Sequence, residues 1–247
     1  MERAEIAVQV VVLAARTILE CSGETYRAEE TAILMCRSFG MSDAEIMAFP
    51  TGFTLAVRKP DGTTETRVMR IQHRRINLGL INDINSVSRR VVARELTPEQ
   101  ALDEIMALRS HPEPPMLRQI ALFALAAGAF AVMFGGGVIE FFISCFVGGI
   151  MQACMPLYTK ARLPSLLVSL VSGVLAAGLS LPLLYVFGGS QESVISGTIM
   201  PLLPGLAMTN AVRDTMRGDL LSGMARATEA LVNAVLLAAG VAVVLML

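Results

Sequence analysis

The pattern of apolar and polar positions changes once along this 247-residue chain. Up to residue 110, short apolar runs alternate with charged positions at helical or strand-like spacing. From residue 117 to the end, apolar residues fill segments of about 18 to 25 residues, long enough to cross a bilayer core of roughly 30 Å. The pattern therefore predicts an α+β domain over residues 1–110 and an α-helical transmembrane domain over residues 117–247.

Helical periodicity recurs four times in the first domain. The second of these helices has Ser22 as a candidate N-cap and Gly40 as a stop signal, and the fourth has Thr97 as N-cap followed by Pro98 in its first turn. Between the second and third helices, the short β-leaning runs AEIMAFP, GFTLAVRKP and TTETRVMR are separated by Pro- and Gly-containing turns, which predict a three-stranded antiparallel meander. The predicted helices cover residues 1–20, 22–40, 76–96 and 98–110.

A proline-rich segment, HPEPPM at residues 111–116, separates the two domains and cannot continue a helix. Beyond it we expect five spans. The fourth is the weakest because two prolines and two glycines interrupt it. The expected spans are residues 117–134, 138–158, 163–187, 193–208 and 225–247.

Charge predicts the orientation. Of the 41 charged residues, 31 precede residue 121. If the first domain is cytoplasmic, the basic residues of the later connectors also lie inside, and the two outside loops carry no Lys or Arg. The sequence therefore predicts a multi-pass protein of the cell (inner) membrane with a cytoplasmic N-terminus and its C-terminus outside.

Few residues suit catalysis or metal binding. The four cysteines form no CxxC pair, the chain has only two histidines, and it has no GxSxG or HExxH motif. We expect no catalytic residues, no metal, no cofactor and no nucleic-acid partner. A hydrolase anchored to the membrane remains a remote alternative.

Two acidic residues fall within the predicted spans. Glu140 lies near the outer end of the second span, and Glu229 lies about one turn into the fifth, four residues before Asn233. Ionisable groups in the membrane are costly and often serve ion pathways, so both are candidates for proton coupling. The alternatives are that Glu140 reaches the outer surface and that Glu229 pairs with Arg226, three residues earlier on one helix face.

The fourth span combines breaks with polar side chains. Prolines inside a membrane helix free backbone carbonyls, and transporters use such broken helices to bind substrates. A kink stabilised by neighbouring helices is the alternative. The candidate substrate-binding residues are Thr198, Pro201, Pro204, Gly205, Thr209 and Asn210.

A charged segment follows the fourth span directly. Asn210, Arg213, Asp214 and Arg217 are spaced to share one helix face, and Asp214 can pair with Arg217. By charge alone this is a solvated cytoplasmic loop, but its position also suits an inner gate. The candidate gate residues are Arg213, Asp214, Arg217, Asp219 and Arg226. Polar residues are also dense at the start of the second helix, at Tyr26, Arg27 and Glu29, where the residues alone favour a solvated face.

Residues 204–241, PGLAMTNAVRDTMRGDLLSGMARATEALVNAVLLAAGV, resemble the signature of the threonine/serine exporter family. That family pairs a PG…N…RD…GD…SG…AR…EA pattern with a G-E-x-Y-R-x-E helix start in its cytoplasmic domain, here Gly23 to Glu29. The pair of glycines and the acidic residue in the first outer turn, Gly135, Gly136 and Glu140, also fit, although family members often have Asp at the acidic position.

The resemblance implies a secondary exporter driven by the proton gradient. Full-length relatives carry about ten spans, so this chain resembles the larger subunit of the split form, which works with a small, separately encoded membrane partner. Some split members are associated with succinate export, so the implied substrates are threonine, serine or a dicarboxylate. We also expect an oligomer in the lipid bilayer, and a scaffold or channel subunit is the other alternative.

Overall fold

The computed structural model describes residues 3–247, and these residues form two compact units. The first unit consists of the chain up to Pro112 together with Leu206–Ala227, and the second consists of Glu113–Gly205 and Thr228–Leu247. The segment Leu206–Ala227 thus folds with the first unit, although the sequence places it between the last two membrane spans.

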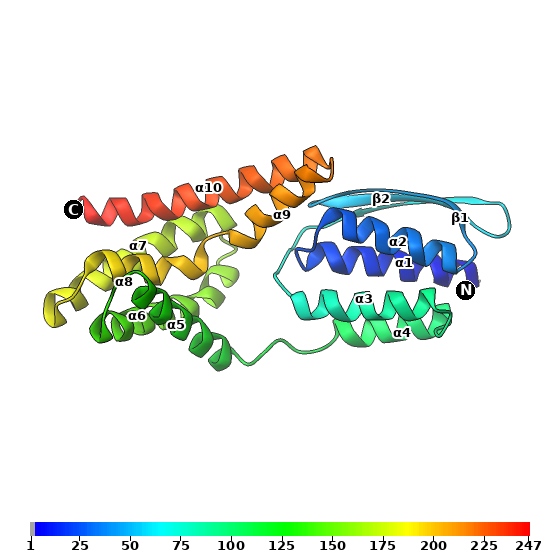
Figure 1. Ribbon diagram of the computed structural model, residues 1–247. Coiled ribbons are helices and arrows are strands. Elements are labelled where there is room, and N and C mark those ends of the chain that lie inside the picture. The colour runs from blue at the N-terminus through cyan, green and yellow to red at the C-terminus, as the bar shows by residue number, and fades with distance from the viewer. Residues whose placement is uncertain (1–2) are drawn as a thin grey trace. The chain divides into compact units, whose positions relative to one another are not determined.

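The first unit is built from helices around one small sheet (Figure 1). The sheet has the order β1-β2-β3 with both pairs antiparallel, which confirms the predicted meander. Helices α1 and α2 form a layer between this sheet and the pair α3 and α4 (Figure 1). The elements are α1 (Arg3–Glu20), α2 (Thr25–Ser38), β1 (Ser42–Phe49), β2 (Gly52–Arg58), β3 (Thr64–Arg70), α3 (Leu78–Val92) and α4 (Pro98–Arg109).

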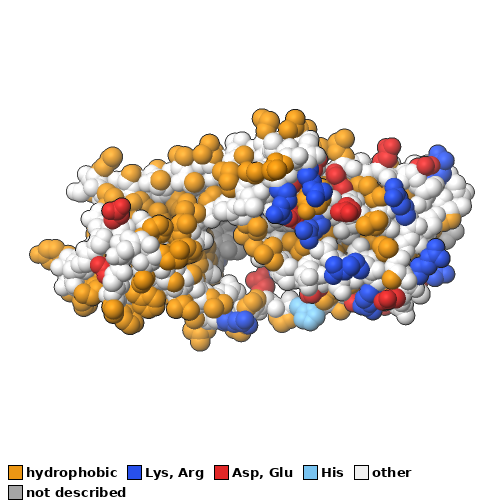
Figure 2. Space-filling view, in the orientation of Figure 1, with side chains coloured by type: hydrophobic (Ala, Val, Ile, Leu, Met, Phe, Trp, Pro, Cys, Tyr) orange, Lys and Arg blue, Asp and Glu red, His pale blue; other side chains and the backbone are white. Residues whose placement is uncertain are grey.

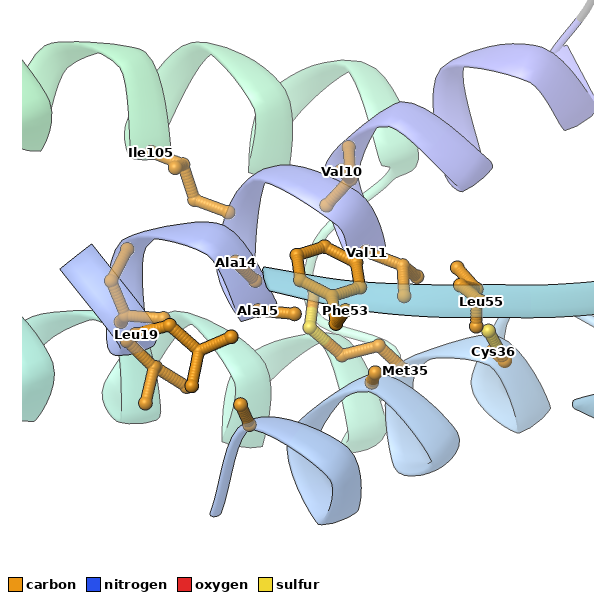
Figure 3. Packing of buried hydrophobic residues seen from close by; sticks show 14 of the residues in the cluster. Val10, Val11, Ala14, Ala15, Leu19, Met35, Cys36, Phe53, Leu55 and Ile105 are labelled. Carbon is orange, nitrogen blue, oxygen red and sulfur yellow. The ribbon is translucent and has the colours of Figure 1, made fainter. Parts of the chain in front are cut away.

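The core of the first unit lies along α1, which contributes buried residues on most of its surface. Figure 3 shows Val11 and Ala15 of α1 beside Phe53 of β2, with Met35 of α2 and Ile105 of α4 close to them. Burial of this apolar surface, at roughly 25 cal/mol per Å², is the main term that holds helices and sheet together. The packing of Met35 into this core gives α2 a fixed position.

The start of α4 agrees with the N-cap predicted from the sequence, whereas the start of α2 does not. Thr97 is the N-cap of α4, as predicted, and it forms a reciprocal capping box with Gln100. The prediction that Ser22 caps α2 is wrong, because Ser22 has a left-handed backbone (φ 62°) and α2 begins only at Thr25, with Glu24 in the N-cap position. The carbonyls of this α1–α2 loop are consequently free to accept hydrogen bonds from elsewhere in the unit.

The second unit contains the membrane helices. Four helices are long and apolar enough to span a membrane, and the pair formed by Gln191–Leu202 and Gly205–Met216 would make a fifth, broken span. The fifth predicted span begins five residues earlier than expected, at Leu220. The elements are α5 (Met116–Met133), α6 (Val138–Lys160), α7 (Ser165–Phe187), α8 (Gln191–Ile199), the 3₁₀ helix η1 (Met200–Leu202) and, running on from the first unit, α10 (Leu220–Leu245). Helix α9 (Gly205–Met216) belongs almost entirely to the first unit.

Small residues let these helices approach closely. A Cβ on Gly240 of α10 would lie 2.2 Å from the carbonyl oxygen of Leu170 and 3.1 Å from the Cα of Gly173 on α7. A Cβ on Gly197 of α8 would lie 2.5 Å from the backbone nitrogen of Ala131 on α5. Apolar side chains gain little free energy by moving from lipid into a helix contact. Membrane helices therefore associate through close van der Waals packing, which small residues allow. In the view of Figure 2, hydrophobic side chains cover much of the second unit, whereas most charged side chains lie on the first.

Candidate functional site

The candidate site lies in the first unit, where α9 and the first turns of α10 pack against the α1–α2 loop and the start of α2. Two hydrogen bonds fix this contact. Asn210 donates from Nδ2 to the Ser22 carbonyl (3.0 Å), and Arg226 donates from Nη2 to the Gly23 carbonyl (2.6 Å). Asn210 and Arg226 are both buried. Residues of the loop between α1 and α2 are therefore held by side chains that lie 188 and 203 positions away in the sequence.

A buried ion pair lies directly behind these bonds. Arg226 Nε is 3.0 Å from Asp214 Oδ2, and both side chains are almost completely shielded from solvent. The sequence-based pairing of Asp214 with Arg217 is wrong, because the turn around Gly218 (φ 92°) brings α10 back beside α9 and presents Arg226 to Asp214. A buried charge of this kind needs a partner, since water cannot reach it.

Glu24 is a second charged junction. Its carboxylate pairs with Arg27 one turn along α2 (3.0 Å) and with Arg213 of α9. Burial alone would raise the pKa of Glu24, but a hydrogen bond within its own residue and the guanidinium groups of Arg27 and Arg213 lower the pKa below its ordinary value. Glu24 therefore stays ionised and links the start of α2 to α9.

Two weaker contacts extend the junction. The guanidinium of Arg217 lies over the ring of Tyr26, 3.7 Å from its centroid, a cation–π contact. Thr25 Oγ1 lies 3.5 Å from Asp219 Oδ2, at the limit of a hydrogen bond. The solvated face expected for the start of α2 is thus covered in part by α9 and the α9–α10 turn.

Glu29 links the same region to the sheet. It accepts a hydrogen bond from the Ala48 N–H of edge strand β1 (2.7 Å), and Ser222 of α10 approaches the Ala48 carbonyl (3.4 Å). Burial raises the pKa of Glu29; the Ala48 bond opposes this, and the carboxylates of Asp219 and Asp214 raise the pKa further. Burial and the neighbouring carboxylates therefore make Glu29 bind a proton more readily than an ordinary glutamate.

This shift predicts a pH dependence for the first unit. A carboxyl whose pKa is raised on folding binds more protons in the folded state, so stability falls as pH rises from the ordinary Glu range through the raised pKa of Glu29. We expect Glu29→Gln, whose amide oxygen can still accept from Ala48, to weaken this fall and to raise the melting temperature on the alkaline side. The measurement is thermal unfolding of the purified chain in detergent at a series of pH values from roughly 4 to 8.

Glu30→Gln is the matched control, since Glu30 is the next residue on α2 and its side chain is exposed. The assignment is contradicted if Glu29→Gln and Glu30→Gln change the pH profile equally.

The cluster unites most of the residues singled out in the two sequence motifs. All five candidate gate residues, as well as Asn210, contact the α1–α2 loop, α2 or one another. Sequence reasoning missed the carbonyls of Ser22 and Gly23 and the hydroxyls of Thr25 and Ser222. The only signal for them was the density of polar residues in both motifs, which does not reveal that the motifs touch.

Glu140 has a different environment in the second unit. Its two carboxylate oxygens accept backbone N–H bonds from Gly137 and Ser190, each at 2.8 Å. It thereby caps the start of α6 and ties it to the loop before α8. This geometry favours a structural role for Glu140 over proton transfer.

The candidate substrate residues divide between the units. Thr198 is buried in α8 and donates to the Val194 carbonyl (2.7 Å), whereas Pro201 lies in η1. Helical hydrogen bonding is interrupted at Leu203 and Pro204, and the helix resumes at Gly205. Thr209 and Asn210 belong to the first unit, and Asn210 is engaged by Ser22.

Glu229 lies on α10 in the second unit and is half-buried. One turn further, Asn233 accepts a hydrogen bond from Ser169 of α7 (3.0 Å), so this side of α10 faces α7. Glu229 shares that side because it precedes Asn233 by four residues. Its position therefore lies on the side of α10 that faces α7.

These features define a multi-pass α-helical membrane protein with a broken span and an appended α+β unit. A family model places it more narrowly: the model of the threonine/serine exporter family (ThrE) matches residues 9–247, nearly the whole chain. The chain belongs to this family, and its function class is that of a membrane exporter of the threonine/serine type. Neither a curated protein nor a solved structure matches the chain in the other two comparisons.

Proposed function

We propose that the chain is one subunit of a secondary exporter that uses the proton gradient to move small polar metabolites out of the cytoplasm. The substrates are threonine/serine-type amino acids or a dicarboxylate such as succinate. A small integral-membrane partner supplies the second half of the transporter. The first unit lies on the cytoplasmic side of the inner membrane, as the distribution of basic residues favours.

The observation that carries this proposal is the interrupted span between α8 and α9. Pro201 and Pro204 lack backbone N–H groups, so carbonyls around η1 lose their helical partners. Unsatisfied backbone is tolerated at membrane depth only where it lines a cavity or is buried in protein, and transporters place substrates at such breaks. The broken span is therefore where we place the substrate.

Coupling to protons requires an ionisable group beside the transport path. Glu229 fits this role better than Glu140, because Glu140 already caps backbone N–H groups whereas Glu229 lies on the helix side that meets α7. The charged cluster of the first unit then acts as the inner gate. Its residues are paired with each other in this state, so opening the gate would require breaking the contacts of Arg213 or Arg226.

The proposal is tested by efflux from vesicles that contain the chain together with its small partner. Vesicles are loaded in turn with labelled threonine, serine and succinate, and release is followed after dilution. We expect one of these substrates to leave faster than from vesicles without the chain, and unlabelled substrate outside to accelerate the release by exchange. Equal release with and without the chain for all three would contradict the proposed substrate class.

Replacing Glu229 by glutamine tests whether Glu229 couples export to protons. Because the amide cannot carry a proton, we expect gradient-driven export to fall to the background, while exchange of labelled for unlabelled substrate persists. Glu140→Gln is the comparison and should retain gradient-driven export if the protein folds, since an amide oxygen can still accept one backbone N–H. Full gradient-driven export by Glu229→Gln would overturn the assignment of Glu229.

A further inference from the structure

The hairpin formed by α9 and the start of α10 has an inverted distribution of polar and apolar side chains. Four of its polar residues, Asn210, Asp214, Ser222 and Arg226, are at most 3% exposed, although Arg213 and Arg217 are exposed. Its large apolar residues point outward: five of them are exposed by 55–82%, namely Val212, Met216, Leu220, Leu221 and Met224. In a domain surrounded by water the opposite arrangement is expected.

Helical periodicity shows that the apolar residues form continuous faces. On α9, Val212 and Met216 are one turn apart, on the side away from Asn210 and Asp214. On α10, Leu220, Leu221 and Met224 lie on the side opposite Ser222 and Arg226. The hairpin therefore presents one apolar surface, and its polar contacts are directed into the first unit.

The apolar face of α10 continues without interruption into the membrane. Leu231 and Val235 are exposed on the same side of the helix as Met224. At 1.5 Å per residue, the 26 residues of α10 extend about 39 Å, which is longer than the roughly 30 Å hydrocarbon core. Part of α10 must therefore lie outside the core, and its first turns are the part that carries the polar residues Ser222 and Arg226, with an apolar face still outward.

Charged side chains border this surface in the way that membrane interfaces favour. Arg213 of α9 and Arg217 in the turn just after it are exposed although they contact Glu24 and Tyr26, and long basic side chains of this kind are favoured where an apolar surface meets lipid phosphates. Exposed apolar surface next to basic residues is the composition of helices that lie in the membrane interface.

We propose that the α9–α10 hairpin of the first unit lies in the membrane interface, with Met216, Leu220, Leu221 and Met224 in contact with lipid. The occupant of this surface is the bilayer, not water and not a second protein. The hairpin fixes the first unit to the membrane through the same residues that hold the α1–α2 loop. This inference needs only that α10 spans a membrane and is independent of the transported substrate.

The chain contains no Trp, so a single introduced Trp reports on one position alone. The experiment compares Leu221→Trp with Met106→Trp in the full-length chain reconstituted in phosphatidylcholine vesicles. Met106 lies on α4 of the same unit and is also exposed, at 54%. Emission is recorded with lipids brominated on their acyl chains and, separately, with aqueous iodide.

We expect brominated lipid to quench most of the emission of Leu221→Trp, which should also be blue-shifted, while iodide has little effect. Met106→Trp should show the reverse. Quenching of Leu221→Trp by iodide to the extent seen for Met106→Trp would show a water-exposed face and overturn the proposal. Protection of Leu221→Trp from both quenchers would show a protein neighbour, such as a partner subunit or second copy, and would overturn it as well. Met216→Trp repeats the test if Leu221→Trp does not fold.

Discussion

Arg226→Ala is expected to destabilise the first unit by about 3–5 kcal/mol, because it leaves the buried carboxylate of Asp214 without its partner. The substitution also removes the hydrogen bond to the Gly23 carbonyl, one of the two loop carbonyls that accept hydrogen bonds from the hairpin. We expect the midpoint of denaturant-induced unfolding of the purified chain to fall well below that of the unmodified protein, and export to be lost with it.

Two variants separate the buried pair from a general effect of removing an arginine. Arg58→Ala breaks a pair with Asp43 (3.1 Å) in which both side chains are more than half exposed, and it should cost less than about 1 kcal/mol. Adding Asp214→Asn to Arg226→Ala removes the unpaired charge and should restore part of the lost stability. If Arg226→Ala lowered the free energy of unfolding no more than Arg58→Ala does, the buried pair would not stabilise the hairpin.

Gly240→Ala is expected to have the largest effect in the second unit. The new Cβ would lie 2.2 Å from the Leu170 carbonyl oxygen, and backbone atoms cannot rotate away as a side chain can. Helices α7 and α10 must then separate, at a cost of about 3 kcal/mol, the upper end for overpacking. The measurement is thermal stability of the chain in detergent, followed by the loss of monodisperse protein on heating.

Gly178→Ala is the matched control because no atom lies within 4 Å of the Cβ it would add to α7. It should be neutral or stabilising by up to about 1 kcal/mol, since Ala favours a helix more than Gly does. Equal melting temperatures for Gly240→Ala and Gly178→Ala would show that the close crossing of α7 and α10 does not contribute to stability.

The elements of the fold could largely be predicted because local signals define them. Periodicity identified the helices, the Pro- and Gly-containing turns separated the three strands, and Thr97 followed by Pro98 marked the start of α4. The start of α2 was misplaced for an equally physical reason. Ser22 has the chemistry of an N-cap, but its backbone is left-handed and its carbonyl is engaged by Asn210.

The candidate site could be predicted only in parts. Spacing grouped Asn210, Arg213, Asp214 and Arg217 on one helix face, but α9 ends at Met216 and Arg217 lies in the following turn. Spacing also could not reveal what these residues contact. The partner of Asp214 depends on the turn at Gly218, which reverses the chain, and the partner of Arg213 lies in α2, far away in the sequence. Long-range pairings of this kind are decided by tertiary packing, which no local pattern encodes.

Proton-driven export is tested most directly by measuring whether a substrate accumulates against its own concentration gradient. Inside-out vesicles containing the chain and its small partner are given labelled threonine, serine or succinate outside, with the vesicle interior acidified. We predict that one substrate accumulates above its external concentration and that collapsing the pH difference with an ionophore abolishes this accumulation. Uptake that only equilibrates, unchanged by the ionophore, would contradict proton-driven export and indicate a passive channel.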